Sequence, residues 1–385
     1  MAFLNILQGI SKQNNKGKLA TVSARGVLPV LLALFQVAPA ATAWASCAVE
    51  RGEPDEPALF VRHFSPECTK ADRAAQTVPA DEILEALKAG KGVSVENAMV
   101  SGDLLLTRLP TVPLASVPLP PSVLATLTGS SVTEARVIRG PFRIKDSVFD
   151  GLLDTQLKPD MVEHRMLGDI VVMQGPVTLR GTTFTKGVDL SRTIFLGRVD
   201  GSAAVFLSDA FFLTCIFDKA VSFEKTAFVG NTRFYQAVFH QPVTFLRAGF
   251  SGLTNFLSVT FKKEASLSRA YFKMGTGFSG SKFEGISDFS EAVFEKNVFF
   301  SQAVFVADAY FRRATFRGEV SFSDAEFKAN DDFAKAYFVQ EPTFTRAKFS
   351  TPRSSTGFEN PVFLAIVGVA LLIFLVAFIV ILKKG

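Results

Sequence analysis

The sequence predicts an all-β protein whose main domain is a four-sided β-solenoid. Phenylalanine recurs at every eleventh position from Phe206 to Phe349. A second series lies between these positions, from Phe212 to Phe344, and is broken only by Leu267. Successive large residues are therefore five and six positions apart in turn. Fixed self-similarity of this kind is the signature of a repeat architecture.

The first series forms the predicted core of the solenoid. Its members are Phe206, Phe217, Phe228, Phe239, Phe250, Phe261, Phe272, Phe283, Phe294, Phe305, Phe316, Phe327, Phe338 and Phe349. Two positions before each member the side chain is small, and Ala is the most frequent choice. Residues two apart lie on the same face of a strand, so each unit is expected to point one small and one large group inward. A helix is excluded, because steps of five and six residues would send the rings around the whole helical cylinder.

Sides of five and six residues in alternation give a coil of about 22 residues with four sides, which stacks each Phe over its own series. The units that carry this pattern include Ala292-Val293-Phe294 and Ala303-Val304-Phe305. They resemble the pentapeptide-repeat family in a Phe-rich form. The resemblance implies a right-handed quadrilateral β-helix, although the alternation departs from the five-residue unit usual in that family.

Residues 1–45 are predicted to be a secretory signal peptide. A basic segment precedes an apolar run from Val27 to Ala38, and Ala43-Trp44-Ala45 forms a small-x-small cleavage site. The basic segment is long, so an uncleaved anchor is the alternative. Cys47 suggests a lipoprotein, but the residues before it, Trp44-Ala45-Ser46, match a lipid-attachment site poorly.

The C-terminal region is predicted to cross a membrane once. Pro361 to Leu382 is an apolar run without a charge, and it is long enough to span about 30 Å of hydrocarbon. Residues 350–360 form a polar linker before it, and residues 383–385 form a short tail. Lys383 and Lys384 in this tail place the C-terminus in the cytoplasm. The expected location is therefore the cell membrane, with the bulk of the chain extracytoplasmic.

The net charge of +5 belongs to the ends of the chain and gives no sign of nucleic-acid binding. Residues 1–45 hold four basic and no acidic residues, and two further lysines stand at the C-terminus. From 206 to 349 the sequence has 17 Lys and Arg against 15 Asp and Glu. A mixed surface of this kind produces no steering field, so no nucleic-acid partner is expected.

Residues 46–80 lack periodicity and are predicted to be a loop-rich segment. Residues 81–89 are predicted to form a helix, because Ile83, Leu84 and Leu87 make one apolar stripe and acidic residues stand at the start. A repeat array needs end pieces that cover its core. This helix is therefore expected to cap the first coil.

Residues 81–170 are expected to contain the capping helix and irregular first coils with insertions. The strand pattern begins near Val93, and the proline-rich stretch 108–124 is predicted to be a loop excursion, since proline cannot donate to a ladder. The regular solenoid is expected over 171–349. Gly201 stands at one position where the second series would have a Phe.

The three cysteines suit an extracytoplasmic protein. Cys47 and Cys68 flank a proline-containing segment and are expected to form a disulfide, the alternative being two unpaired thiols. Cys215 occupies a small inward position and is expected to be a core residue.

No catalytic constellation is found in the sequence. The three histidines, His63, His164 and His240, lack neighbours at metal-ligand spacing. We therefore expect no enzymatic activity, no cofactor and no metal. Some pentapeptide-repeat proteins imitate DNA with an acidic rod, but this rod is nearly neutral and is expected to lie outside the cytoplasm.

The predicted function is that of a non-catalytic, membrane-anchored β-solenoid, which serves an unknown protein partner as a rigid interaction module or spacer. The alternative is an accessory subunit of a membrane complex, such as a channel or transporter, that associates through its C-terminal helix. The last coil is also expected to need a cover. Family resemblance suggests a homodimer through this terminal coil, with Phe338, Phe344 and Phe349 at the interface.

Overall fold

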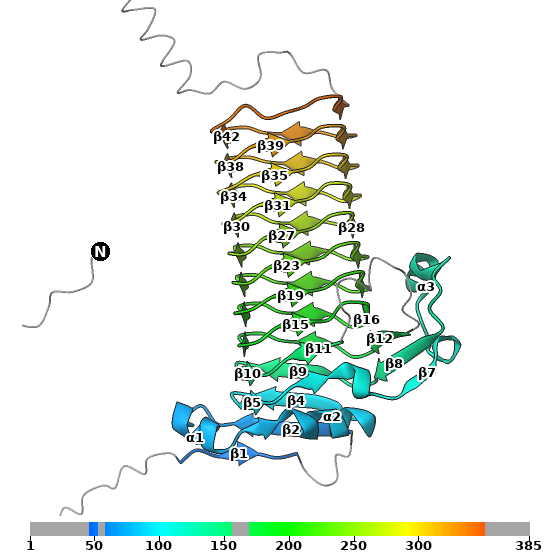
Figure 1. Ribbon diagram of the computed structural model, residues 1–385, viewed down its shortest axis with the longest axis vertical. Coiled ribbons are helices and arrows are strands. Elements are labelled where there is room, and N and C mark those ends of the chain that lie inside the picture. Colours follow the sequence, from blue (N-terminus) through cyan, green and yellow to red (C-terminus); the bar gives the residue numbers. More distant parts are fainter. Residues whose placement is uncertain (1–45, 53–57, 156–168, 351–385) are drawn as a thin grey trace, which may run out of the picture. The chain divides into compact units, whose positions relative to one another are not determined.

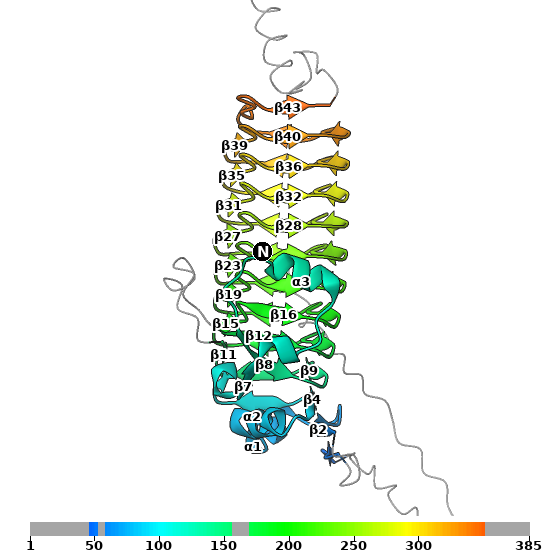
Figure 2. The same cartoon turned by 90° about the vertical axis from the view of Figure 1, so that its right-hand side faces the viewer.

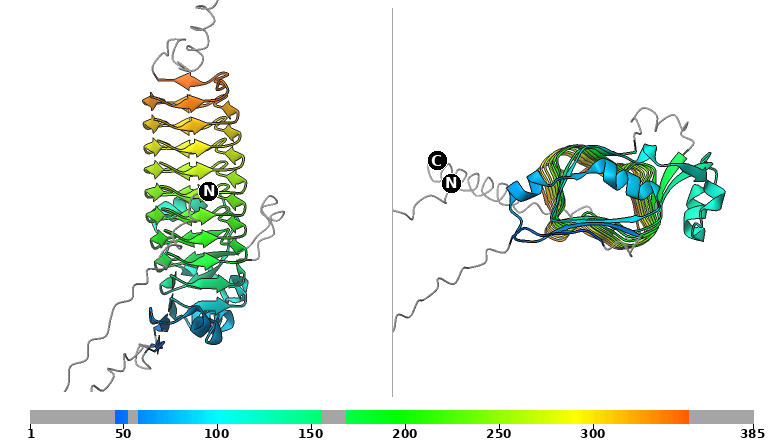
Figure 3. Two further views of the ribbon diagram at one scale, coloured as in Figure 1. Left: turned by 90° about the vertical axis from the view of Figure 1, so that its left-hand side faces the viewer. Right: turned by 90° about the horizontal axis from the view of Figure 1, so that it is seen from below.

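A computed structural model describes residues 46–52, 58–155 and 169–350. They form a tube of mostly parallel β-strands, in which the chain passes through four sheets in turn on each coil (Figures 1 and 3). The predicted four-sided β-solenoid is therefore confirmed. We name the four sheets faces A to D, in the order in which the chain passes through them.

Face A has 12 strands and face B has 11. Face A comprises β1 (Val49–Glu50), β2 (Leu59–Phe64), β4 (Gly92–Glu96), β9 (Phe142–Lys145), β13 (Val177–Thr178), β17 (Val199–Asp200), β21 (Val221–Ser222), β25 (Val243–Thr244), β29 (Ala265–Ser266), β33 (Ser287–Asp288), β37 (Ala309–Tyr310) and β41 (Asp331–Asp332). Face B comprises β3 (Val78–Pro79), β5 (Met99–Ser101), β10 (Val148–Asp150), β14 (Thr183–Phe184), β18 (Val205–Phe206), β22 (Ala227–Phe228), β26 (Gly249–Phe250), β30 (Tyr271–Phe272), β34 (Val293–Phe294), β38 (Thr315–Phe316) and β42 (Tyr337–Phe338).

Face C has nine strands and face D has 11. Face C comprises β6 (Leu104–Leu105), β11 (Leu153–Asp154), β15 (Val188–Asp189), β19 (Ala210–Phe211), β23 (Thr232–Arg233), β27 (Thr254–Asn255), β31 (Thr276–Gly277), β35 (Val298–Phe299) and β39 (Val320–Ser321). Face D comprises β7 (Thr111–Pro113), β8 (Glu134–Ile138), β12 (Asp169–Met173), β16 (Thr193–Phe195), β20 (Ile216–Phe217), β24 (Val238–Phe239), β28 (Thr260–Phe261), β32 (Lys282–Phe283), β36 (Val304–Phe305), β40 (Glu326–Phe327) and β43 (Lys348–Phe349).

The register between coils explains the eleven-residue period. Val205 pairs with Ala227 and Phe206 with Phe228, so each residue stacks on the one 22 positions later. One coil therefore holds two members of each series. The first series lies on faces B and D, and the second lies at the ends of the strands of faces A and C. Backbone amides donate to carbonyls of the neighbouring coil, as from Val229 to Phe206 over 2.8 Å.

The Phe rings form parallel stacks along the tube. The centroids of Phe206 and Phe228 lie 5.0 Å apart with nearly parallel rings, whereas Phe206 meets Phe212 of its own coil edge to face. Such aromatic pairs add about 0.5–1.5 kcal/mol each beyond their burial. A Cβ at Gly201 would lie 2.7 Å from the Phe223 ring, so Phe223 fills the space beside that glycine.

The corners of the coils use a left-handed backbone at regular intervals. The residues with positive φ include Arg192, Ala203, Thr214, Lys225, Gln236, Arg247, Ser258, Arg269, Gly280, Glu291, Gln302, Arg313, Asp324, Lys335 and Arg346. These positions are also eleven apart, and the series begins at Gly181, so only two of its members, Gly181 and Gly280, are glycine. A non-glycine residue in this conformation costs roughly 1–2 kcal/mol. Ladder bonds and core packing on both sides of each corner offset that cost.

Replacing Thr214 by Gly is expected to raise the free energy of unfolding by about 0.5–1 kcal/mol. Thr214 is β-branched and has φ of 53°, so glycine relieves strain that exceeds its own entropic cost. Thr315→Gly is the matched control, because Thr315 lies in strand β38 and glycine there brings entropy cost alone. Urea unfolding followed by circular dichroism measures both. Equal destabilisation by the two glycines would contradict the strained corner.

Helix α2 (Ala80–Lys88) closes the N-terminal end of the tube (Figure 3). It agrees with the predicted capping helix to within one residue at each end. Its side chains Ile83, Leu84 and Leu87 are buried in the same core as the Phe stacks. The helix therefore removes the apolar end of the first coil from water.

The prediction of a loop-rich segment over 46–80 is wrong. It contains β1, β2, the short helix α1 (Lys70–Ala75) and β3. Strand β2 pairs in parallel with β4, so the solenoid begins one coil before the predicted start near Val93. The five-residue pattern is lacking because β2 is a six-residue strand that lies under the cap rather than between two regular coils.

The stretch 108–124 does leave the coil, but it is not a simple loop. The chain forms η1 (Leu106–Arg108), β7, η2 (Leu114–Ser116) and helix α3 (Pro121–Leu127), and then returns through β8. Strand β7 is antiparallel to β8. Figure 2 shows α3 lying over face D of the tube. We call residues 109–133 the α3 flap.

Several predictions fall on residues outside the described ranges. These are the signal peptide at 1–45, most of the linker at 350–360, the membrane span at 361–382 and the tail at 383–385. Among residues 46–52, 58–155 and 169–350, no helix is long and apolar enough to cross a membrane.

Candidate functional site

The structure places the predicted core phenylalanines inside the tube rather than at a site open to a ligand. The twelve members of the first series from Phe206 to Phe327 are buried. The final members are different, because Phe338, Phe344 and Phe349 are only partly buried against the core. The last described coil is thus the place where the Phe stacks come nearest to solvent.

An exposed apolar surface lies on face B and on its corner with face C. We call it the face-B patch, and it comprises Val205, Leu207, Ala227, Val229, Gly249, Leu253, Tyr271 and Met274. Leu207, Val229, Leu253, Tyr271 and Met274 are 41–57% exposed, while Val205, Ala227 and Gly249 are half-buried. Contiguous apolar surface of this kind on a folded protein marks an interaction site.

Strand register makes the face-B patch continuous. Val205, Ala227, Gly249 and Tyr271 are successive partners on β18, β22, β26 and β30, so they form one outward column. Each occupies the position before an inward Phe. The remaining members stand at or near the corner that follows these strands. There the Leu253 side chain lies over Gly275 of the next coil, at 3.7 Å from the position that a Cβ on this glycine would take.

Basic residues border the face-B patch on the side of face A. Lys225, Arg247 and Arg269 are exposed and stand two positions before the patch residues of their coils. Glu224 pairs with Lys225 at 3.0 Å, and Glu291 pairs with Arg269 at 2.9 Å. Three cations therefore face two carboxylates along this edge, which gives it a small positive excess.

The phenol of Tyr271 stays neutral within the face-B patch. Partial burial, followed by the nearby Glu295 carboxylate, raises the pKa of Tyr271 above its ordinary value. A neutral, amphipathic ring of this kind is typical of contact surfaces. The patch thus presents the Tyr271 hydroxyl, and the corner column that begins with Leu207 and Val229 becomes polar at Ser251 and Lys273.

A second apolar cluster lies beneath the α3 flap, apart from the Phe core. The outward column of face D there reads Val172, Ile194 and Ile216, all buried, and Val123 of α3 packs against them. The column continues with Val238 and then becomes polar at Thr260. Apolar residues therefore face outward on face D where the flap covers them.

Polar groups connect the outer edge of the flap to face D beside a groove of about 640 Å³. Ser122 donates to Asp218 over 2.8 Å, and Thr126 lies 3.0 Å from Nε2 of His240. Nδ1 of His240 lies 3.3 Å from the same Asp218 oxygen. Burial opposes ionisation of Asp218, but bonds from Ser122, Lys219 and His240 outweigh it and lower the pKa of this carboxyl.

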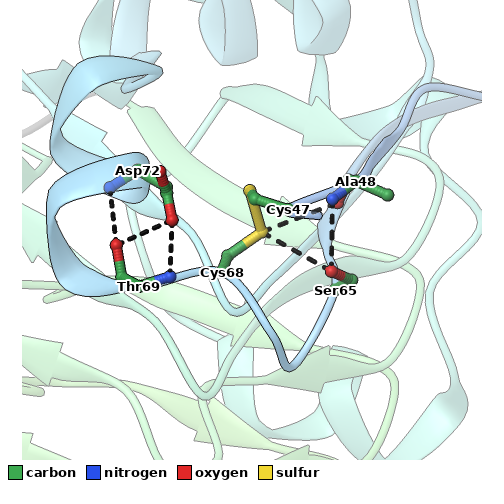
Figure 4. Close-up of a disulfide and its surroundings, with 6 residues drawn as sticks. All are labelled: Cys47, Ala48, Ser65, Cys68, Thr69 and Asp72. Carbon is green, nitrogen blue, oxygen red and sulfur yellow. Dashed lines mark hydrogen bonds between the residues drawn. A yellow bond between two sulfur atoms is a disulfide. The ribbon is translucent and has the colours of Figure 1, made fainter. Parts of the chain in front are cut away.

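Cys47 and Cys68 are joined by a disulfide (Figure 4). It ties the start of β1 to the turn that leads into α1. At that turn Thr69 and Asp72 form a reciprocal capping box, and the hydrogen bonds from Thr69 lower the pKa of Asp72. Cys215 is buried and donates to the carbonyl of Leu190, and burial raises the pKa of its thiol.

The two histidines that the structure describes lie far apart, one near the N-terminal end of the tube and one near its middle. His63 contacts Glu50 and Ser94 near the N-terminal cap, at 3.1 and 2.8 Å. His240 lies beside the flap, and His164 is outside the described residues. Over residues 46–52, 58–155 and 169–350, no group of three or more His, Cys, Asp or Glu side chains could hold a metal ion.

Comparison with known families agrees with the repeat pattern. A family model described as pentapeptide repeats (9 copies) matches residues 278–326, which lie in the C-terminal half of the regular array. This part of the chain is similar to pentapeptide repeats, and the fold is a β-solenoid of structural, protein-interaction type. No curated protein and no solved structure matches the chain.

The sequence reasoning found the core but missed the face-B patch and the flap contacts. The signal for the patch is the residue before each inward Phe, which is uncharged on face B at Val205, Ala227, Gly249 and Tyr271. The Phe periodicity describes inward positions only. Members of the first series lie alternately on faces B and D. The residues before them must therefore be sorted by face before an outward column can be read from the sequence.

Proposed function

We propose that this protein is a non-catalytic interaction scaffold that holds a partner protein on the face-B patch. The proposal is supported by five large apolar side chains that are exposed on four successive coils of a rigid tube. The partner would present an apolar strip with acidic residues beside it, complementary to Lys225, Arg247 and Arg269. Burying such a strip supplies about 25 cal/mol per Å² of apolar surface.

Membrane attachment belongs to the same proposal. Residues 1–45 would direct export, and the apolar run 361–382 would hold the solenoid at the outer side of the cell membrane. The fold is typically structural rather than catalytic. A stack of coils suits a spacer, because each coil contacts only its neighbours and the surface columns stay in fixed register.

A photo-crosslinking side chain placed at Val229 tests the scaffold in intact cells. We expect a discrete adduct with one partner protein at position 229 and no such adduct at Ile286. Ile286 is the matched control, because it is 43% exposed but precedes strand β33 of face A, outside the patch. Leu207→Asp should reduce the adduct at least tenfold, as expected when a charge enters an apolar contact.

Two outcomes would contradict the proposal. Equal adducts at positions 229 and 286 would show that the patch has no special role. Loss of the adduct when residues 361–382 are replaced by an unrelated apolar helix would instead favour an accessory subunit that binds laterally within the membrane. A homodimer that forms through Phe338, Phe344 and Phe349 stays a separate prediction. Analytical ultracentrifugation tests it by measuring the oligomeric state.

A further inference from the structure

Small residues interrupt the outward column of the face-B patch. Val205 and Tyr271 stand at its two ends, with Ala227 and Gly249 between them on successive coils. A Cβ added to Gly249 would find no atom within 4 Å beyond its chain neighbours. The patch therefore contains a shallow trough over two coils, and its floor is largely the backbone of strands β22 and β26.

Side chains on both sides form walls along this trough. Val229 and Ser251 form one wall, directly after the inward Phe of their coils. Lys225 and Arg247 form the other, two positions before the residues of the floor. The two walls are four residues apart, which is roughly 13 Å of extended chain. An α-helix with its side chains is about 10–12 Å wide, so it fits between them.

The wall on the side of face A is cationic. We call Lys225, Arg247 and Arg269 the basic ridge, because they occupy the same corner on three successive coils. The outer two have carboxylate partners. Arg247 is exposed, and no carboxylate of residues 46–52, 58–155 or 169–350 lies within ion-pair distance of it. Like charges on neighbouring strands repel each other, so a carboxylate from a partner would relieve this repulsion and pair with Arg247.

The spacing of the coils decides which kind of partner element fits the trough lengthwise. Neighbouring coils are about 4.8 Å apart, so the three steps from Val205 to Tyr271 cover about 14 Å. Side chains on one face of a helix recur about every 5.4 Å, and three turns cover about 16 Å. Side chains on one face of an extended strand recur about every 6.7 Å, and three repeats cover about 20 Å. A helix therefore stays close to the register of the coils, whereas a strand does not.

We propose that the partner binds through an amphipathic α-helix that lies along the tube axis in this trough. A length of about 14 Å at a rise of about 1.5 Å per residue gives a helix of about ten residues. Its apolar stripe contacts Val229 and the floor at Gly249, and the ring of Tyr271 closes one end. Acidic residues on one flank, three or four positions apart, pair with the basic ridge. Such a helix presupposes the scaffold function proposed above, because it is the part of the partner that occupies the face-B patch.

Photo-crosslinking in intact cells tests the helix. The crosslinking side chain is placed in turn at Leu207, Val229 and Ser251, which lie in one column on successive coils. Mass spectrometry of each adduct then identifies the partner residue that was attached. We expect these residues to lie in one segment and to advance by three or four positions per coil, since a coil step of about 4.8 Å is about three residues of helix. An advance of one or two positions per coil, or attachment to unrelated segments, would overturn the helix.

Two substitutions test the trough and the basic ridge separately. Gly249→Val fills the floor without a clash and should reduce the adduct at position 229 about fivefold. Arg247→Glu should reduce it about tenfold, and changing the mapped acidic residue of the partner to Arg should restore it. Thr315→Val and Lys263→Glu are the matched controls and should leave the adduct unchanged. Thr315 lies three coils beyond Gly249 in the same column, and Lys263 lies on the corner between faces D and A.

The outcomes separate the helix from the scaffold function itself. Absence of adducts at all three crosslinking positions of the parent would overturn both. Adducts that form in the parent and are unaffected by Gly249→Val and Arg247→Glu would overturn the helix in the trough and leave the scaffold function in place.

Discussion

Replacing Phe294 by Ala is expected to lower the free energy of unfolding by about 3–5 kcal/mol. The Phe294 ring is buried between Phe272 and Phe316, with centroids 4.7 and 5.1 Å away and nearly parallel rings. Its edge also meets Phe300. Ala leaves a ring-sized cavity in the middle of a stack, and the neighbouring coils cannot close it because their ladder bonds fix the spacing between them.

Phe299→Ala is a control of the same chemistry only five positions away. Phe299 points outward from strand β35 and is 41% exposed, so its loss should change stability by no more than about 0.5 kcal/mol. Urea unfolding of both variants, followed by far-UV circular dichroism, makes the comparison. If Phe294→Ala were no more destabilising than Phe299→Ala, the inward stack would not be what holds the coils together.

The four-sided solenoid could be predicted because its core repeats the same contact many times. Each Phe lies 22 residues from the Phe on which it stacks, as with Phe206 and Phe228, so the coil length appears directly as a period in the sequence. The capping helix was also predictable, because Ile83, Leu84 and Leu87 form an isolated amphipathic stripe directly before the first strands with that pattern.

The corner backbone could not be predicted from residue type. Sixteen residues at eleven-residue spacing, from Gly181 to Arg346, adopt positive φ, but side chains such as Arg, Lys, Gln and Thr give no local signal for it. The conformation is imposed by the ladder bonds of the strands on either side. Tertiary structure thus overrides local preference at these positions.

The flap was missed for a different reason. Prolines such as Pro110 and Pro120 indicate that the chain leaves the ladder, but they do not show where it returns. The relevant signal lies 50 to 100 residues later, in the outward residues Val172, Ile194 and Ile216. An outward column should be polar when water covers it. A run of apolar residues in that column therefore predicts a covering element.

The N-terminal strands carry too few repeats to be recognised. In strand β2 only Val61 and Phe64 are buried, three positions apart, so it lacks the two-residue pattern of the regular coils, and its partner β4 lies beyond a helix. A period needs several copies before it stands out from chance. The disulfide between Cys47 and Cys68 acts in this same region, where few coil-to-coil contacts are available.

Removing the disulfide by the double change Cys47→Ala and Cys68→Ala is expected to destabilise the N-terminal cap by about 3 kcal/mol. The bond closes a loop with a sequence separation of 21 residues, and it restricts the unfolded chain. Strand β1 has two residues and is the edge strand of face A, where it pairs with β2 on one side, so little else holds it. The regular coils further along the tube should keep their stability, because each coil contacts only its neighbours.

Hydrogen exchange in the full-length protein separates these two regions. In the double variant, amides of β2 should exchange faster by about two orders of magnitude, which corresponds to 3 kcal/mol, while amides around Phe294 stay unchanged. A reducing agent should reproduce this pattern in the parent and have no effect on the variant. Cys215→Ala controls for loss of a cysteine elsewhere, because that thiol is free and buried inside the tube. If β2 stayed fully protected without the disulfide, helix α2 and the pairing of β2 with β4 would be sufficient to hold the first coil.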